Sequence, residues 1–288
     1  MSSILTNNGA MVALQTLKGI NASLSKTQDQ ISTGKDINSA KDDAAIWAIS
    51  KVMESDVSSF KAVSKSLALA TGAISTATNA AESVQKLLGE MKTKVVAAKD
   101  GNLDRATLQK DFNDLRAQIG TTVAGSQFNG INLVNGDEFD GESTFKALSA
   151  LNRAQDGTVT ADTIDIDLTD TDLRVTGGSV QAMTDLEDMD LTNITDWDEA
   201  LKKVEDAINA AVGAASAFGS ANKRIEIQSN FISKLADSMT SAIGSLVDAD
   251  MEEASARLQA LQTQQQLGIQ SLSIANQAPK SLLSLFQG

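Results

Sequence analysis

Residues 46–98 read IWAISKVMESDVSSFKAVSKSLALATGAISTATNAAESVQKLLGEMKTKVVAA, and this stretch decides the fold. Alternating steps of three and four residues from Ile46 pick out sixteen positions, of which only Asp56 is polar. Apolar residues at this spacing line one face of an α-helix. At about 1.5 Å per residue this helix would be roughly 80 Å long, too long for a compact domain. The sequence therefore predicts a rod that packs against other rods.

Two further helices are predicted downstream of this stretch. After a break at residues 99–102, a short helix carries Leu108, Phe112, Leu115 and Ile119 on one face. A second long helix opens near Asp196, and the polar residues at two of its seam positions are expected to set the register. Its predicted stripe is Leu201, Val204, Ile208, Ala211, Ala215, Phe218, Asn222, Ile225, Ser229, Ile232, Ala236, Met239, Ile243 and Leu246.

Both ends of the chain carry narrower stripes of the same kind. So narrow a seam gives a helix little stability alone, because most helical stability in proteins comes from packing an apolar face. We therefore expect ends that become ordered only when they pair with other helices. The N-terminal stripe is Ala10, Ala13, Leu17, Ile20, Leu24, Thr27 and Ile31, and the C-terminal stripe is Met251, Ala254, Leu258, Leu261, Gln265, Gly268, Leu272 and Ala275.

Each terminal stripe is one residue out of phase with the long helix beside it. The register of the second long helix would next use Asp250 and Glu253, but the apolar stripe resumes at Met251 and Ala254. The N-terminal stripe is out of phase with Ile46 in the same way. Such an inserted residue changes the winding or marks a break. The predicted segments are an N-terminal helix (1–43), the N half of a helical core (44–136), an acidic, partly β, outward-facing segment (137–195), the C half of the core (196–247) and a C-terminal helix (248–288).

The middle segment differs from the helical parts in charge and pattern. Residues 137–198 contain 16 acidic and 3 basic residues, a difference of −13 that equals the net charge of the whole chain. Residues 158–180 are rich in Asp and β-branched residues, with two-residue alternation at 163–168 and a turn signal at Gly177-Gly178, so one or two hairpins are predicted. Asp165, Asp167 and their neighbours at 170 and 172 suggest a calcium loop, but the glycine at the sixth loop position and the glutamate at the twelfth are missing. We expect them to face water.

Composition argues against several classes of function. The chain has no cysteine and no histidine, which removes thiolate and imidazole chemistry, and no arrangement of the remaining groups points to an enzyme, a metal or a cofactor. The helical parts carry no basic surface for nucleic acid. The first fifteen residues do not read as a cleaved signal peptide, and no apolar run is long enough to insert into a membrane. The expected fold is mainly α, a long antiparallel, coiled-coil-like rod with a small β-hairpin segment in mid-chain.

The order of these parts resembles that of bacterial flagellin, the subunit of the flagellar filament. The similarity rests on AMVALQTLKGINASLSKTQDQISTGKDINSAKDDAA at 10–45, SQFNGINLVNG at 126–136 and EEASARLQALQTQQQLGIQSLSIANQAPKSLLSLF at 252–286. The last motif, with ANQAP at 275–279, is the most specific. Residues 46–48 and the short middle segment resemble the α-proteobacterial type.

The resemblance implies that the two end segments are disordered in the free subunit and form the inner helical tube of a homopolymeric filament used for motility. It also implies export through the flagellar export apparatus with its chaperone, without a cleaved signal peptide, and assembly outside the cell among the filament cap and hook-junction proteins. The residues expected to carry self-assembly are Leu14, Leu17, Ile20, Leu24, Ile31, Met251, Leu258, Leu261, Leu272, Ile274, Leu282, Leu285 and Phe286.

Two other functions fit parts of the sequence. An intracellular coiled-coil scaffold would explain the long heptads but not the terminal motifs. A hook-filament junction protein shares the helical ends and the fold of flagellin, although the complete SIANQAPKSLLSLF ending at 273–286 favours the filament subunit.

Overall fold

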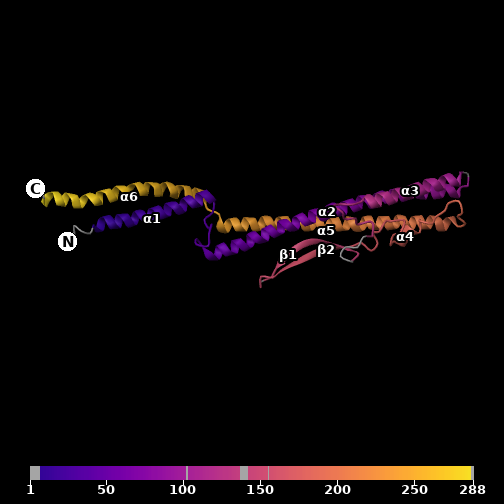
Figure 1. The fold of residues 1–288 in the computed structure, drawn as a ribbon, viewed down its shortest axis with the longest axis horizontal. Helices are drawn as coiled ribbons and strands as arrows, with labels where there is room; N and C mark the ends of the chain where they lie inside the picture. Colours follow the sequence, from indigo (N-terminus) through magenta and orange to yellow (C-terminus); the bar gives the residue numbers. More distant parts are fainter. Residues whose placement is uncertain (1–6, 102, 137–141, 155, 287–288) are drawn as a thin grey trace. The chain divides into compact units, whose positions relative to one another are not determined.

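The computed structural model describes residues 7–101, 103–136, 142–154 and 156–286, with side chains described as far as Gln277. Most of these residues are helical, and one antiparallel pair of strands lies in mid-chain (Figure 1), which confirms the prediction of a mainly α fold with a small hairpin. The elements are α1 (Asn8–Thr33), α2 (Ala44–Lys99), α3 (Arg105–Gly125), β1 (Thr144–Arg153), β2 (Val159–Asp167), α4 (Gln181–Thr184), α5 (Trp197–Val247) and α6 (Met251–Phe286).

The chain divides into two compact units. Residues 1–57 and 238–288 form one, here called the terminal unit, and residues 58–237 form the other, the central unit. Helices α2 and α5 each contribute residues to both units. The five segments predicted from the phase slips divide the chain differently, and their boundaries stay a prediction.

The core of the central unit is built on the apolar stripe of α2. Each of the predicted seam positions from Phe60 to Ala98 is buried, and Val63, Leu67 and Ile74 are fully enclosed. Completely burying one such side chain contributes roughly 1.5–3 kcal/mol. The repeat read from the sequence therefore identifies the buried face of this helix along the whole of the central unit.

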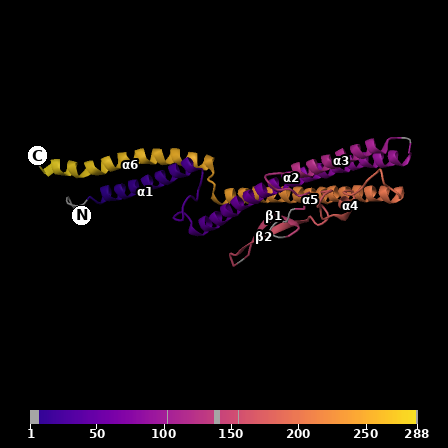
Figure 2. The same cartoon turned by 45° about the vertical axis from the view of Figure 1, so that its right-hand side comes forward.

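Helix α5 runs antiparallel to α2 in the central unit. Lys99 Nζ lies 2.8 Å from an Asp198 carboxylate oxygen, and Lys92 pairs with Glu205, so later residues of α2 meet earlier residues of α5. The two helices lie side by side in Figures 1 and 2. These ion pairs set the direction of the packing, but they are exposed and each contributes little stability.

The predicted stripe of α5 is wrong at alternate positions. The structure buries Ala200, Ala207, Ala214 and Ala221, where the sequence predicts the neighbouring residues Leu201, Ile208, Ala215 and Asn222. The predicted residues are only partly buried. Alanine occupies each of these buried positions, whereas the larger Leu201, Ile208 and Asn222 are partly exposed beside them. Asn222 is therefore not the buried polar seam residue that was expected to set the register.

Side-chain oxygens define where the helices begin. Each capping oxygen accepts a hydrogen bond from a backbone N–H two or three residues later, which satisfies donors that have no partner inside the helix. The predicted start of α5 at Asp196 is confirmed, since its carboxylate accepts from the N–H groups of Asp198 and Glu199. The capping residues are Asn7 for α1, Asp43 for α2, Asp104 for α3, Asp196 for α5 and Asp250 for α6.

The β-hairpin uses a strand that the sequence analysis missed. β2 contains the predicted alternation, with Ile164 and Ile166 buried, but its partner is the upstream strand β1 and the turn lies near Gly157 rather than at Gly177-Gly178. The hairpin lies alongside α5, where Gln228 donates a 2.9 Å hydrogen bond to the backbone oxygen of Ser149. β1 was not predicted because Ala147, Ser149 and Ala150 give it only a weak alternation of apolar and polar residues.

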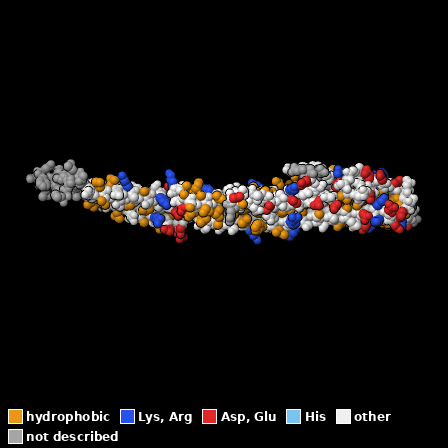
Figure 3. Space-filling model, turned by 90° about the horizontal axis from the view of Figure 1, so that it is seen from below, with side chains coloured by type: hydrophobic (Ala, Val, Ile, Leu, Met, Phe, Trp, Pro, Cys, Tyr) orange, Lys and Arg blue, Asp and Glu red, His pale blue; other side chains and the backbone are white. Residues whose placement is uncertain are grey.

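Carboxylates from the later part of the acidic segment lie beside the start of α5, where Asp185, Asp188 and Asp190 line a pocket together with Asp196. Figure 3 shows acidic side chains concentrated at the end where α4 and the start of α5 lie. Asp165, Asp167 and Asp170 are exposed, as expected for residues that keep a hairpin soluble. For Asp172 that prediction is wrong, because its side chain is completely buried.

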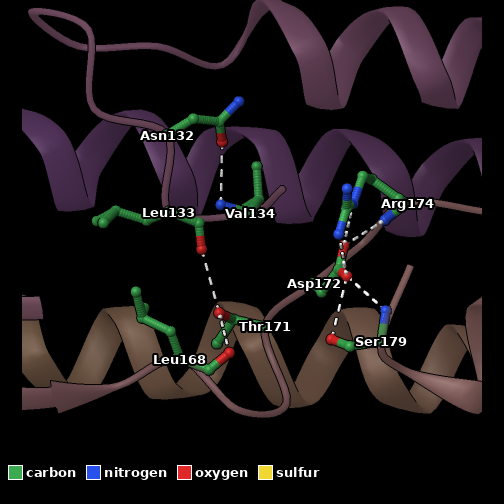
Figure 4. Close-up of polar contacts among 8 residues, drawn as sticks. All are labelled: Asn132, Leu133, Val134, Leu168, Thr171, Asp172, Arg174 and Ser179. Atoms are coloured by element: carbon green, nitrogen blue, oxygen red, sulfur yellow. Dashed lines mark hydrogen bonds and ion pairs between the residues drawn. The ribbon is translucent and has the colours of Figure 1, made fainter. Parts of the chain in front are cut away.

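Asp172 organises the junction between the helices and the acidic segment (Figure 4). One of its carboxylate oxygens accepts from the backbone N–H and Nε of Arg174, and the other accepts from the guanidinium of Arg174 and from the N–H and hydroxyl of Ser179. Burial by itself raises the pKa of this carboxyl, but the hydrogen bonds from Arg174 and Ser179 outweigh burial and leave the pKa below its usual value. The negative charge is therefore part of the fold.

The motif at residues 126–136 packs against this buried acid. The Leu173 N–H donates a 2.9 Å hydrogen bond to the backbone oxygen of Val134, and the Thr171 hydroxyl lies 3.1 Å from the backbone oxygen of Leu133. Gly136 has φ +68°, and a Cβ there would lie 2.7 Å from both Asp172 and Arg174. The glycine is required at this position for its conformation and for the close approach.

The contact between Gly72 and Phe128 predicts a selective effect of adding one methyl group. A Cβ at Gly72 would lie 2.6 Å from the Phe128 ring, whereas nothing lies within 4 Å of a Cβ at Gly89 in the same helix. Gly72→Ala should destabilise the protein by about 1–3 kcal/mol through overpacking. Gly89→Ala should be neutral or stabilise by up to about 1 kcal/mol, since alanine favours helix. Urea unfolding followed by circular dichroism measures both, and equal effects would contradict the packing described.

Asp172→Asn should destabilise the central unit by about 1–3 kcal/mol near neutral pH, because it removes the charge that Arg174 and Ser179 hold. The pKa of Asp172 is lowered in the folded protein, so its stabilising effect is present above the pKa of the unfolded chain and is lost as pH falls through the folded pKa. The difference in unfolding free energy between the two proteins should therefore shrink below about pH 4. A difference independent of pH would show that the charge is not responsible.

Candidate functional site

Helices α1 and α6 pack against each other as an antiparallel pair in the terminal unit (Figure 1). At one end of the pair, Asn7 Nδ2 donates a 2.7 Å hydrogen bond to the backbone oxygen of Ala275. Further along, Gln265 Nε2 donates to Asn21 Oδ1 at 2.7 Å. Later residues of α1 thus meet earlier residues of α6. The two ends of the chain, far apart in the sequence, form one structure.

The structure brings most of the predicted assembly residues into this contact. Leu17, Ile20, Leu24, Ile31, Leu258, Leu261 and Leu272 are partly buried between the two helices, whereas Leu14, Met251 and Ile274 are exposed. The exposed residues lie off the seam or at its end. The backbone of Leu282, Leu285 and Phe286 belongs to α6, but their side chains lie outside the described part of the structure.

Large apolar side chains also lie on the outer faces of this pair. Such side chains cluster where α1 begins and in the later half of α6, and Figure 3 shows apolar groups exposed over that part of the pair. Each is at least 44% exposed, and contiguous exposed apolar surface of this kind marks interaction sites. The outer apolar residues, as they are called below, are Met11, Val12, Leu14, Leu267, Ile269 and Ile274.

Sequence reasoning included Leu14 and Ile274 but missed the other four of these residues, Met11, Val12, Leu267 and Ile269, because it relied mainly on the seam. A signal was available, since the first turns of α1 are apolar on nearly every side. A helix that is hydrophobic all round is normally buried.

A short backbone clasp joins the two segments that lead out of the helix pair. Gly34 has φ +70° and ends α1, and its backbone oxygen accepts a 2.9 Å hydrogen bond from the N–H of Ala249. The N–H of Asp36 donates a 2.8 Å hydrogen bond to the backbone oxygen of Val247. The segment that follows α1 and the segment that precedes α6 are therefore held side by side.

Several carboxyl groups with lowered pKa values serve turns and helix caps, and those of Glu54 and Asp198 are lowered by neighbouring lysines. The hydroxyl of Thr107 and the N–H of Ala106 lower the pKa of Asp104, which caps α3. Thr158 and Thr169 lower the pKa of Asp156 and Asp167 in the same way. In the described ranges, no three acidic side chains are arranged to hold a metal ion. A search of the same ranges finds no helix with the length and apolarity of a membrane span.

Known proteins similar to this chain share its helical ends. The family model of the bacterial flagellin N-terminal helical region matches residues 4–138, and that of the C-terminal helical region matches residues 201–286. Flagellin FljK of Caulobacter vibrioides is 38% identical, with 100% of this chain and 99% of that protein covered. A flagellin of Brucella melitensis is also 38% identical, with 100% of both chains covered.

A solved structure shows a similar fold at lower sequence identity. It is that of a putative flagellar hook-associated protein from Vibrio parahaemolyticus, with a TM-score of 0.51 and 16% identity over 72% of this chain and 100% of that chain. A sequence identity of 16% supports a similar fold but says nothing about function.

Proposed function

Because the chain belongs to the bacterial flagellin family, we propose that the α1–α6 pair is the surface through which its copies assemble. The chain is of the α-proteobacterial type and is a structural subunit that self-assembles into the flagellar filament used for motility. The observation that carries the proposal is the set of outer apolar residues on both terminal helices. A single chain leaves this surface in water, and neighbouring copies would cover it.

The proposed assembly uses two kinds of helix contact. The seam pairs α1 with α6 within a subunit, and it includes Leu17, Leu24, Leu258 and Leu261. The outer apolar residues then contact the corresponding helices of other copies. Contacts between different surfaces of identical subunits generate open helical polymers when the rotation does not close a ring. In this proposal residues 1–43 and 248–288 are the inner helices of the filament, and residues 137–195 face outward.

Other functions receive less support. The hook-associated protein matches in fold at 16% identity, whereas the full-length relatives at 38% identity are flagellins. An intracellular scaffold has no support beyond the long heptads. The flagellin family is one of structural subunits rather than enzymes, and we assign no catalytic role to the chain.

We also propose that the subunit is exported unfolded by the flagellar export apparatus, with a dedicated chaperone and without a cleaved signal peptide. It would then assemble beneath the filament cap, on a base of hook-junction proteins. The support is family membership together with composition, since the chain has no cysteine and one proline. Neither disulfide formation nor slow proline isomerisation would then trap a folded chain before export.

A charge in the seam should block assembly, and the same charge in the hairpin should not. Leu258→Asp places a carboxylate between α1 and α6, where burial of a charge is unfavourable. Thr160→Asp adds the same charge at an exposed position of β2. Sedimentation and electron microscopy after polymerisation should show filaments only for the hairpin variant, while both soluble proteins unfold at similar urea concentrations. Equal loss of filaments in both variants would contradict the proposal that the terminal helices lie inside the filament and the hairpin outside.

Unassembled subunits should lose both ends to limited proteolysis by a protease of broad specificity. Roughly the first 40 and last 40 residues should be removed and the central unit spared, because without neighbouring copies the α1–α6 pair opens and exposes its backbone to proteases. Assembled filaments should resist the same treatment. Resistance of the termini in the soluble protein would refute the idea that they are ordered by assembly.

A further inference from the structure

The seam between α1 and α6 contains two residues that are poor at stabilising a helix pair. Gln265 and Gly268 both occupy stripe positions, where an apolar side chain would bury more surface. Both are partly buried in the structure. A polar residue at one seam position of a coiled coil sets the register of the helices at a cost in stability. The contacts of Gln265 and Gly268 with α1 differ between the observed register and a shifted one.

Gln265 has a hydrogen-bonding partner on α1, at the solvent-exposed edge of the seam. Its amide nitrogen donates a 2.7 Å hydrogen bond to the side-chain oxygen of Asn21. If α6 slipped by one heptad toward the start of α1, Gln265 would instead lie near Leu14, which has no hydrogen-bonding side chain. The amide pair therefore distinguishes the observed register from the slipped one.

Gly268 distinguishes the same two registers by shape. A Cβ at Gly268 would lie 2.9 Å from Leu17 Cδ1 and 3.7 Å from Ile20 Cδ1, so these two side chains occupy the space that a larger residue would need. After the same slip, Gly268 would lie opposite Ala10, and two small residues would leave a void. Voids of this kind lose both apolar burial and van der Waals contact.

The backbone clasp continues this register beyond the helices. The backbones of Lys35 and Asp248 form an isolated antiparallel β-bridge. At the opposite end of the pair, Asn7 is hydrogen-bonded to Ala275. Both contacts belong to the antiparallel alignment in which Asn21 meets Gln265. A slip by one heptad would break all of them at once.

We propose that Gln265 and Gly268 are specificity residues that select one register between α1 and α6. The inference rests on the proposed role of the helix pair in assembly and adds which residues decide how it aligns. Their function is to exclude the pairing slipped by one heptad, which would otherwise bury a similar leucine-rich seam.

Disulfide trapping in assembled filaments tests the proposal, because the chain has no cysteine of its own. Gly9→Cys with Ala275→Cys reports the observed register, since a Cβ at Gly9 would lie 4.0 Å from the Cβ of Ala275. This separation lies within the range of disulfides. Ser23→Cys with Ala254→Cys reports the slip of one heptad, which would bring those two positions together. Oxidised glutathione serves as the oxidant, and gel mobility separates intrachain from interchain bonds.

In the otherwise unchanged chain, the Gly9/Ala275 pair should form the intrachain disulfide and the Ser23/Ala254 pair should not. Adding Gln265→Leu and Gly268→Leu should raise the yield of the slipped disulfide by at least about fivefold, since both changes favour the slipped seam. Gln266→Leu with Gly19→Leu is the matched control, because Gln266 is exposed and nothing lies within 4 Å of a Cβ at Gly19. The control should leave both yields unchanged.

Variants that do not polymerise alone are copolymerised as a labelled minority with the unchanged chain, which keeps the disulfide readout. Exchange of the amide pair, Asn21→Gln with Gln265→Asn, should retain the observed register. If the leucine variants form only the Gly9/Ala275 disulfide, the specificity role is overturned while the pairing stands. If the unchanged background fails to form the Gly9/Ala275 disulfide, the proposed pairing itself is wrong.

Discussion

Burial of the apolar stripe of α2 is the interaction on which the rest of the structure depends. From Phe60 to Ala98 this stripe is removed from water, and α5 runs antiparallel along it. The hairpin is in turn held on α5 through Gln228 and Ser149. A helix as long as α2 is only marginally stable by itself, because helix nucleation is unfavourable and packing of its apolar face supplies most of the stabilisation. Without the seam, neither the second helix nor the acidic segment would have a surface to pack on.

The terminal helices carry the same kind of heptad stripe, but their seam side chains are less buried than those of α2. Seam residues such as Leu17 and Leu261 are only partly buried, and large apolar side chains such as Met11 and Ile274 face water. The central unit fully buries its seam side chains, whereas those of the α1–α6 pair stay partly exposed. In the assembly proposed above, neighbouring copies would cover the exposed apolar residues of the terminal helices.

Much of the fold could be predicted from local patterns, and the failures share a cause. The stripe of α2 from Phe60 to Ala98 and the start of α5 at Asp196 were correct because they depend on periodicity and on a cap within three residues, whereas Ile49, also predicted on the stripe, is exposed. The alanine face of α5, the strand β1 and the buried Asp172 were not, because each depends on contacts between segments that local periodicity does not encode. Ala207 is buried only because another helix approaches it, and Asp172 is tolerated inside only because Arg174 and Ser179 compensate its charge.

For the candidate site, too, some features follow from local sequence and others only from the tertiary structure. The chain alone specifies two terminal helices, the phase slips that separate them from the core, and the motifs that identify the family, since all of these are encoded by neighbouring residues. Which helix pairs with which, in what direction and in what register, was decided only by the tertiary structure. Contacts such as Asn21 with Gln265 and Leu17 with Gly268 join positions nearly the whole chain apart, and heptad spacing is equally compatible with every shift by seven residues.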